Sequence, residues 1–560
     1  MTRFSGLFVE ETGEYRKETF LIMSIFDKIK IKVTGGNPES VKTNRPTKHS
    51  SSTHASAGSR AMPGDASDNA GFCSTRGGGF VTAPEAVLQG LAPDGGLYVD
   101  PGLATGGGFD VEGCLQLKPL EQAEKILSRL LPGFGDMGGL VRRAYEGRFA
   151  SNELTPLVPV GDDFVLELFH GPTAAFKDVA LCMLPQLMTA ARGITGMKET
   201  TVILTATSGD TGKAALEGFH DVVGTGIMVF FPHQGVSAVQ EAQMLTQDGK
   251  NVVVCAVNGN FDDCQSAVKA VFSAAGGKPP APGVLFSSAN SINIGRLAPQ
   301  VVYYFLAYAS LLRQGKITFG DLVDYVVPTG NFGDILAGWY AKQLGLPVGK
   351  LVCASNANRV LTDFIQTGVY DRRRSFYKTN SPSMDILVSS NLERLLYYAA
   401  GGDTETVRND MLRLQNSGYY KISAGALSFI QKDFSAYCCD EAQTLEMIRE
   451  CFHKNGYLPD THTAVALHAA REYRQNEGGE APLVVLSTAS PFKFPASVLT
   501  ALGESAEGNA FAQMEKLAQV TGLQAPESLR GLQNREILHR DVIEKTDIAD
   551  YVAEKLNRFR

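Results

Sequence analysis

The sequence predicts an α/β protein built on parallel β-sheets that helices cover on both faces. Two observations carry this prediction. From about residue 160 onward, short and nearly continuous runs of β-branched residues alternate with stretches of helical spacing. Several of these runs lead into a glycine-rich loop that precedes the next helix. In open parallel sheets, ligands bind at the carboxyl ends of the strands, so functional residues are expected in these loops.

The elements follow this pattern in order along the chain. Near the start, a helical stretch at 84–91 is followed by a turn at 92–96 and a short strand at 97–99. The later runs predict strands at 201–205, 226–231, 251–257, 325–328 and 483–486. Helices are predicted at 214–219, 262–273 and 330–344, and Gly345 and Pro347 end the last of them. The chain contains no internal repeat.

Length and composition limit the class of protein. A chain of 560 residues is too long for one compact core, so about two to four domains are expected. The net charge of −7 argues against a nucleic-acid or anionic-membrane partner, and no apolar run is long enough to span a bilayer. The nine cysteines are an odd number without a Cys-x-x-Cys pair. This pattern argues against a disulfide framework and a metal site and favours a reducing compartment.

Residues 1–70 have a different character. Residues 35–70 are rich in Ser, Gly, Pro, Thr and Asn, so this extension is predicted to be largely disordered. Between Ser24 and Met62 there are seven Lys or Arg and two Asp or Glu, as in a transit peptide, but residues 1–23 contain four glutamates, which transit peptides avoid. A plain tail on a cytoplasmic protein is the favoured interpretation, with organelle targeting as the alternative. Met23 is a second candidate start.

Lys177 lies among small and apolar neighbours in the run Glu-Leu-Phe-His-Gly-Pro-Thr-Ala-Ala-Phe-Lys-Asp, residues 167–178. Burial lowers the pKa of a lysine, and a neutral amine can form a Schiff base with a carbonyl, as pyridoxal phosphate requires. The alternative is a surface lysine at the start of a helix. The flanking His170 is interpreted as a hydrogen-bonded structural residue rather than as the base.

Four further loops are candidate parts of a binding site. Thr205-Ala-Thr-Ser-Gly-Asp-Thr-Gly-Lys213 and Thr329-Gly-Asn-Phe-Gly-Asp334 each follow a strand and present backbone N–H groups to an anion. The first is not a nucleotide-binding P-loop, because Ser208 and Ala214 break that motif. The other two are Ser287-Ser-Ala-Asn-Ser-Ile-Asn-Ile-Gly-Arg296 and Ser487-Thr-Ala-Ser-Pro-Phe-Lys-Phe494. Each loop alone is also compatible with a structural turn or helix cap.

Taken together, the segments resemble the threonine synthase family, in its longer bacterial and fungal branch. The resemblance covers about residues 71–500. The matching segments occur in the family's order and spacing: Ser74–Gly77, Gly90–Tyr98, His170–Lys177, Thr207–Gly212, Asn290–Arg296, Gly330–Asp334, Ser381–Leu387, Ser389–Leu395 and Ser487–Pro491.

The resemblance implies a fold-type II enzyme that holds pyridoxal 5′-phosphate between two α/β regions. Lys177 would be the catalytic residue, bound to the cofactor as an imine and carrying protons in the reaction. Gly330, Asn331, Phe332 and Asp334 match the loop around the cofactor phosphate, and Thr488 matches the residue that bonds the pyridine nitrogen. The substrate's carboxylate and phosphate would be bound by Ser208, Asp210, Thr211, Asn293 and Arg296.

The implied division of the chain is an extension at 1–70, an N-terminal domain at 71–160, a catalytic region of two subdomains at 161–500 and a helical segment at 501–560. The implied reaction converts O-phospho-L-homoserine and water to L-threonine and phosphate, the last step of threonine biosynthesis, by a carbon–oxygen lyase (EC 4.2.3.1). A monomer or homodimer is expected. The alternatives are a phospho-lyase that releases 2-oxobutyrate, a serine or threonine dehydratase, and a non-catalytic binding protein, against which the presence of Lys177 argues.

Overall fold

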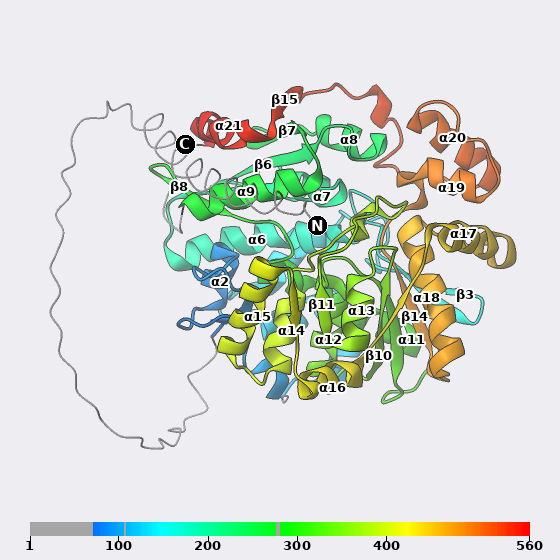
Figure 1. Cartoon of the computed structure of the whole chain (residues 1–560). Coiled ribbons are helices and arrows are strands. Elements are labelled where there is room, and N and C mark those ends of the chain that lie inside the picture. Colours follow the sequence, from blue (N-terminus) through cyan, green and yellow to red (C-terminus); the bar gives the residue numbers. More distant parts are fainter. Residues whose placement is uncertain (1–70, 106–107, 276–279, 560) are drawn as a thin grey trace, which may run out of the picture.

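Two sheets with their covering helices make up most of the computed structural model, which describes residues 71–105, 108–275 and 280–559 (Figure 1). The larger sheet has six strands in the order β13-β10-β9-β14-β4-β3. All its pairs are parallel except β3 with β4. In this order the strands are Phe434–Cys438, Val348–Ser355, Val323–Pro328, Leu483–Ser487, Asp163–Glu167 and Leu157–Val160.

The second sheet has five strands in the order β15-β7-β6-β5-β8, and all its pairs are parallel. In this order they are Asp541–Glu544, Val252–Asn258, Thr225–Pro232, Thr200–Ala206 and Val284–Ser287. Side chains alternate between the faces: Val202 and Leu204 pack with α9 (Phe261–Ala275) and α21 (Ile548–Lys555), whereas Ile203 belongs to the main core. Because both faces are covered, the strands read as continuous apolar runs.

The main core contains α6 (Lys177–Thr195), α7 (Asp210–Phe219), α11 (Val301–Arg313) and α12 (Gly333–Gln343). Helix α6 packs against α7, and α11 packs against α12. The short α10 (Ile294–Leu297) lies against α6. The other helices of this central part are α8 (Ala238–Leu245), α13 (Val360–Thr367), α14 (Leu392–Ala399), α15 (Thr404–Ser417), α16 (Ala424–Asp433), α17 (Glu441–Asn455) and α18 (Thr461–Glu477).

The N-terminal part of the described chain packs onto this core and is drawn in blue in Figure 1. It contains the helices α2 (Ala83–Gln89), α3 (Val111–Leu115), α4 (Pro119–Leu130) and α5 (Met137–Tyr145) and the antiparallel strands β1 (Cys73–Ser74) and β2 (Tyr98–Val99). Thr82 and Glu85 form a capping box that fixes the start of α2. The remaining small sheet pairs β11 (Val369–Asp371) with β12 (Tyr419–Lys421).

The C-terminal part contains α19 (Pro495–Ala501), α20 (Ala510–Thr521) and α21. The sequence predicts only helices here, but the chain also supplies β15, which extends the second sheet beside β7. The four residues of β15 are charged at both ends and mostly exposed, so they lack the buried apolar run that identified the other strands. The proposed division into domains stays a prediction.

The predicted α/β class with helix-covered parallel sheets is confirmed, and each strand and helix predicted above has a counterpart within a few residues. The strands that were not predicted include β10, whose apolar run Gly349 and Lys350 interrupt. None of the helices in the described residues is long and apolar enough to cross a membrane. The predicted disorder and targeting function of residues 1–70 lie outside the described residues.

Candidate active site

Lys177 begins helix α6, directly after a tight turn that its neighbours hold in place. The carboxylate of Asp178 accepts hydrogen bonds from the backbone N–H of Thr173 at 2.9 Å and from its hydroxyl at 2.5 Å. The N–H of Phe176 donates to the carbonyl oxygen of Thr488 over 2.8 Å. This turn therefore fixes Lys177 beside the loop that follows β14.

The Lys177 side chain is buried, and its Nζ lies 3.4 Å from Oδ2 of Asp210. The Nζ is also 4.5 Å from the centre of the Phe176 ring. Burial lowers the pKa of Lys177; the Asp210 carboxylate opposes this shift, and the cations of Arg296 and Lys493 add to it. A lowered pKa raises the fraction of neutral amine near pH 7, which is the form that attacks a carbonyl carbon.

The loop between β5 and α7 is held by Thr207, whose Oγ1 accepts hydrogen bonds from the N–H groups of Gly209 at 3.0 Å and Gly212 at 2.8 Å. Gly209 has φ = 130°, a conformation that favours glycine. Among the described residues, no acceptor bonds the N–H groups of residues 208, 210 and 211. Ser208 and Thr211 line the pocket that contains Lys177. The helix start can thus bind an anion there.

A second set of backbone donors lies at the start of α12, after β9. Phe332 adopts a left-handed conformation, φ = 63°, and directs the chain into the helix. Within the described part of the chain, the N–H groups of residues 330–335 find no protein acceptor. Residues 330–334 line the same pocket. The hydroxyl of Ser389 donates to the Gly330 carbonyl over 2.8 Å and fixes the other side of the loop.

Asp334 lies in this loop with its carboxyl group buried. Its Oδ1 accepts hydrogen bonds from the hydroxyls of Tyr303 at 2.5 Å and Tyr304 at 3.3 Å, whereas Oδ2 has no partner among the described residues. Burial raises the pKa of Asp334 to about 7, although the two tyrosine hydrogen bonds oppose the shift. The carboxyl group is therefore partly protonated near neutral pH and can itself donate a hydrogen bond.

Arg296 is buried in α10 and lines the pocket. Its guanidinium donates to the Ala289 carbonyl at 2.7 Å and to Thr211 Oγ1 at 3.5 Å. No carboxylate in the described residues pairs with it, and burial lowers its pKa to about 10. A buried guanidinium without a carboxylate is well suited to bind an anionic ligand.

Asn293 does not line the pocket, and the structure gives it a different function. Its Oδ1 caps α10 by accepting the Gly295 N–H at 2.9 Å, and its Nδ2 donates to the Val87 carbonyl at 2.9 Å. The amide is buried and its Oδ1 and Nδ2 are already bonded to protein atoms, which does not favour the predicted contact with the substrate. His170 likewise lies outside this pocket, with Nε2 2.8 Å from the Glu167 carboxylate.

Thr488 follows β14 and lines the pocket with its side chain largely buried. Its hydroxyl has no hydrogen-bond partner in the described chain. The structure thus brings together around one pocket the following predicted residues: Lys177, Ser208, Thr211, Arg296, Gly330, Asn331, Phe332, Asp334 and Thr488. Asp210 contacts Lys177 at the edge of this group.

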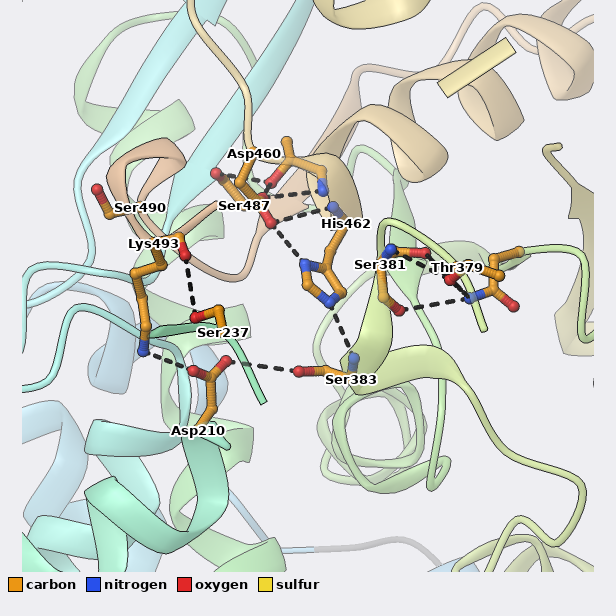
Figure 2. A network of polar contacts seen from close by, with 12 residues as sticks. Asp210, Ser237, Thr379, Ser381, Ser383, Asp460, His462, Ser487, Ser490 and Lys493 are labelled. Carbon is orange, nitrogen blue, oxygen red and sulfur yellow. Dashed lines mark hydrogen bonds and ion pairs between the residues drawn. The ribbon is translucent and has the colours of Figure 1, made fainter. Parts of the chain in front are cut away.

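The prediction from sequence missed five residues of a polar network that surrounds Asp210, part of which Figure 2 shows. Lys493 Nζ lies 2.6 Å from Asp210 Oδ1, and the Ser383 hydroxyl lies 3.5 Å from Oδ2. The backbone N–H of Ser383 donates to Nε2 of His462, whose Nδ1 is 2.6 Å from the Asp460 carboxylate. The last missed residue, Gln240, donates to Asp210 Oδ1 at 2.8 Å. Only the run Ser-Pro-Phe-Lys pointed to Lys493, and nothing in that run identifies its partner.

Comparison with known proteins agrees with this geometry. The family of pyridoxal-phosphate dependent enzymes matches residues 155–489, and the threonine synthase C-terminal family matches residues 463–548. The threonine synthase of Pseudomonas aeruginosa is 39% identical over 76% of this chain and 89% of its own length. The chain belongs to the threonine synthase family. Members of this family are pyridoxal phosphate-dependent lyases.

Two further relatives show how much of this member of the threonine synthase family is similar to known proteins. A crystal structure of threonine synthase from Brucella melitensis with bound pyridoxal phosphate has a TM-score of 0.75 and 38% identity, over 86% of this chain and 99% of that chain. Human threonine synthase-like 1 is 41% identical over 75% of this chain. The match covers only 58% of that relative's length.

The residues around Lys177 fit pyridoxal phosphate. The N–H groups of residues 330–335, which no described acceptor bonds, provide donors for a phosphate group at the start of α12. The Asp334 carboxyl group adds a donor when its unpaired Oδ2 is protonated. The unpartnered hydroxyl of Thr488 lies in the same pocket as Lys177 and suits a ring nitrogen. An amine, a phosphate site and a hydroxyl around one pocket match the reactive groups of the cofactor.

Proposed function

We propose that this protein converts O-phospho-L-homoserine and water to L-threonine and phosphate. Bound pyridoxal phosphate supplies the electron sink that stabilises negative charge on the substrate's carbon atoms. The N–H groups of residues 330–335 and Asp334 hold its phosphate. The Thr488 hydroxyl would bond the pyridine nitrogen and, as a hydroxyl rather than a carboxylate, would favour its unprotonated form. Lys177 holds the cofactor through its Nζ.

Arg296 carries the proposal for the substrate. It is a buried cation with no carboxylate partner among the described residues, and it shares a pocket with Lys177. With Ser208 and Thr211 it forms a second anion-binding group, separate from the start of α12. The substrate carries a carboxylate and a phosphate, so a pocket for it needs anion sites beyond that of the cofactor. Homoserine would leave one of them unpaired and should be rejected.

Lys177 moves the protons in this scheme. With its Nζ free and neutral, Lys177 would take a proton from the α carbon and then one from the β carbon, after which phosphate would leave from the γ carbon. It would then return one proton at the γ carbon and, after the hydroxyl of a water molecule has added at the β carbon, one at the α carbon. The other proton of that water would go to the released phosphate. One amine can serve these positions only if bulk water is kept away, and the burial of Lys177 and its neighbours meets this condition.

Product analysis tests the proposal. The full chain, loaded with pyridoxal phosphate, should release threonine and phosphate in equal amounts from O-phosphohomoserine and nothing from homoserine. Lys177→Ala should retain the fold, lose turnover and fail to bind the cofactor covalently, so borohydride should leave no label at this position. A protein without an absorbance band of bound cofactor, or an active Lys177→Ala variant, would contradict the assignment.

A phospho-lyase that releases 2-oxobutyrate is the second candidate, since the chain is also similar to threonine synthase-like 1 proteins. The same assay separates the two, because 2-oxobutyrate as the main product would replace the synthase proposal with this one. The oligomeric state, monomer or homodimer, and the cytoplasmic location stay predictions.

A further inference from the structure

The carboxylate of Asp210 is bound unequally at its two oxygens (Figure 2). Oδ1 has two close donors: Lys493 Nζ at 2.6 Å and Gln240 Nε2 at 2.8 Å. Oδ2 has only two long contacts, at 3.4 Å to Lys177 Nζ and at 3.5 Å to the Ser383 hydroxyl. The carboxylate is therefore held firmly by Lys493 and only loosely by Lys177.

Lys493 is fully buried, at 0% exposure. Besides Asp210, its Nζ donates to the Thr173 carbonyl oxygen at 3.1 Å. Burying an ammonium group without a counter-ion costs a large desolvation free energy, so a charged Lys493 at this position requires the Asp210 carboxylate. The pair also joins two parts of the fold, because Asp210 begins α7 beside the five-stranded sheet and Lys493 follows β14 of the six-stranded sheet.

The charges of this group do not balance if both lysines are protonated. Two ammonium groups would share one carboxylate in a buried space and leave one excess positive charge. The proton is most easily lost from the lysine with the longer contact, which is Lys177. We propose that Lys493 is a positioning residue that occupies Asp210 and thereby keeps the Lys177 amine neutral.

This inference rests on the proposed function in one respect: the neutral form of Lys177 is the one that attacks the carbonyl carbon of the cofactor. The other charged or titratable groups near Lys177 are Arg296 on α10, Asp334 on α12, His462 on α18 and Asp178 on α6 itself. None of the four forms a hydrogen bond or ion pair with Asp210 or Lys493, and all four are kept in the variants below, so a shift in the pKa of Lys177 is assigned to the pair.

The test measures the protonation of Lys177 directly. The full chain, freed of cofactor, is acetylated with trace acetic anhydride across a series of pH values, and the label on Lys177 is measured by mass spectrometry. In Lys493→Met, Lys177 is the only lysine left beside the Asp210 carboxylate in the described site. The labelling midpoint should therefore move up by about one pH unit, which lowers the neutral fraction of the Lys177 amine about tenfold. The pH profile for attachment of added pyridoxal phosphate, followed by absorbance, should move in the same direction. Lys493→Arg keeps the charge and should keep the wild-type midpoint.

Asp210→Asn provides a second, independent variant if Lys493→Met does not fold. It removes the carboxylate that contacts Lys177 Nζ, so the labelling midpoint should move down. In the double variant, Lys493→Met should raise the midpoint less than it does in the wild type. Lys213→Met is the matched control. Lys213 is also buried in α7 and pairs with Glu217 at 3.1 Å, but it does not line the pocket, so its loss should leave the Lys177 midpoint unchanged.

An unchanged or lowered midpoint in Lys493→Met, or an unchanged midpoint in Asp210→Asn, overturns the inference. The labelling does not depend on the reaction. A shifted midpoint in a protein that binds no pyridoxal phosphate would refute the proposed function alone, and an unshifted midpoint in an active synthase would refute this inference alone.

Discussion

Gly330 lies where the loop after β9 passes close to the backbone of residues 381–385. A Cβ at this position would be 2.8 Å from the Ser383 carbonyl oxygen and 3.4 Å from the Met384 Cα. Comfortable contacts between such atoms begin at about 3.3–3.5 Å, so Gly330→Ala must separate the two segments by about 0.5 Å. Both partners are backbone atoms, and no side-chain rotation can relieve the contact. Overpacking of this kind costs about 1–3 kcal/mol of unfolding free energy.

The movement should also disturb the site, because Ser383 is fixed on its other side by the hydrogen bond of its N–H to His462 at 3.1 Å. We expect Gly330→Ala to lower the unfolding free energy, measured with urea, by about 1–3 kcal/mol and to weaken the binding of pyridoxal phosphate, measured by absorbance titration. Gly193→Ala is the control, since a Cβ there meets nothing within 4 Å on the exposed side of α6. It should leave stability unchanged or raise it by up to about 1 kcal/mol. If Gly330→Ala matches the wild type in both measurements, the close approach of these segments is not as described.

Two further predictions concern stability. Asp334 has a pKa of about 7 in the folded chain against 3.8 as its ordinary value, so the folded state holds a proton that the unfolded state has lost between about pH 4 and pH 7. The unfolding free energy should therefore fall as pH rises through this window, and Asp334 should account for at most about 4 kcal/mol of the fall. Asp334→Asn should lack this contribution when both proteins are unfolded with urea at pH 5, 6, 7 and 8. An equal fall in both proteins would contradict this. Asn293→Ala should lower the unfolding free energy by about 1–3 kcal/mol, because it removes the cap of α10 and the hydrogen bond to the Val87 carbonyl. If the variant is as stable as the wild type but binds substrate more weakly, Asn293 has the predicted binding role instead.

Much of the site could be predicted from the sequence because its elements are local. Lys177 and Thr488 stand within short segments whose strand, turn and helix are encoded by neighbouring residues. The same holds for the loop 330–334, where a strand of β-branched residues leads directly into glycines and a helix start. Once the strands are parallel, their carboxyl ends meet at one edge of a sheet. The sequence therefore places these loops together without any knowledge of tertiary contacts.

The remaining features depend on contacts between distant residues. A sequence shows that Lys493 is a lysine, but not that it is fully buried against Asp210 in another part of the fold. The same limit explains Asn293. A run of polar residues before an arginine is compatible with both a helix cap and a ligand site. Only the contacts of the Asn293 side chain with Val87 and Gly295 favour the cap. In each case the deciding quantity is an orientation, which local composition does not encode.

The pocket combines groups from both sheets, and this arrangement has a consequence for its chemistry. Ser208 and Thr211 follow β5 of one sheet, whereas the loop at 330–334 and Thr488 follow strands of the other. The contacts of Asp210 with Lys493 and Ser383 cross between these parts beside Lys177. A shift of one part against the other would change these distances and, with them, the charge of the Lys177 amine. If Lys493 acts on Lys177 as proposed, the protonation of the Lys177 amine therefore depends on the relative position of the two sheets.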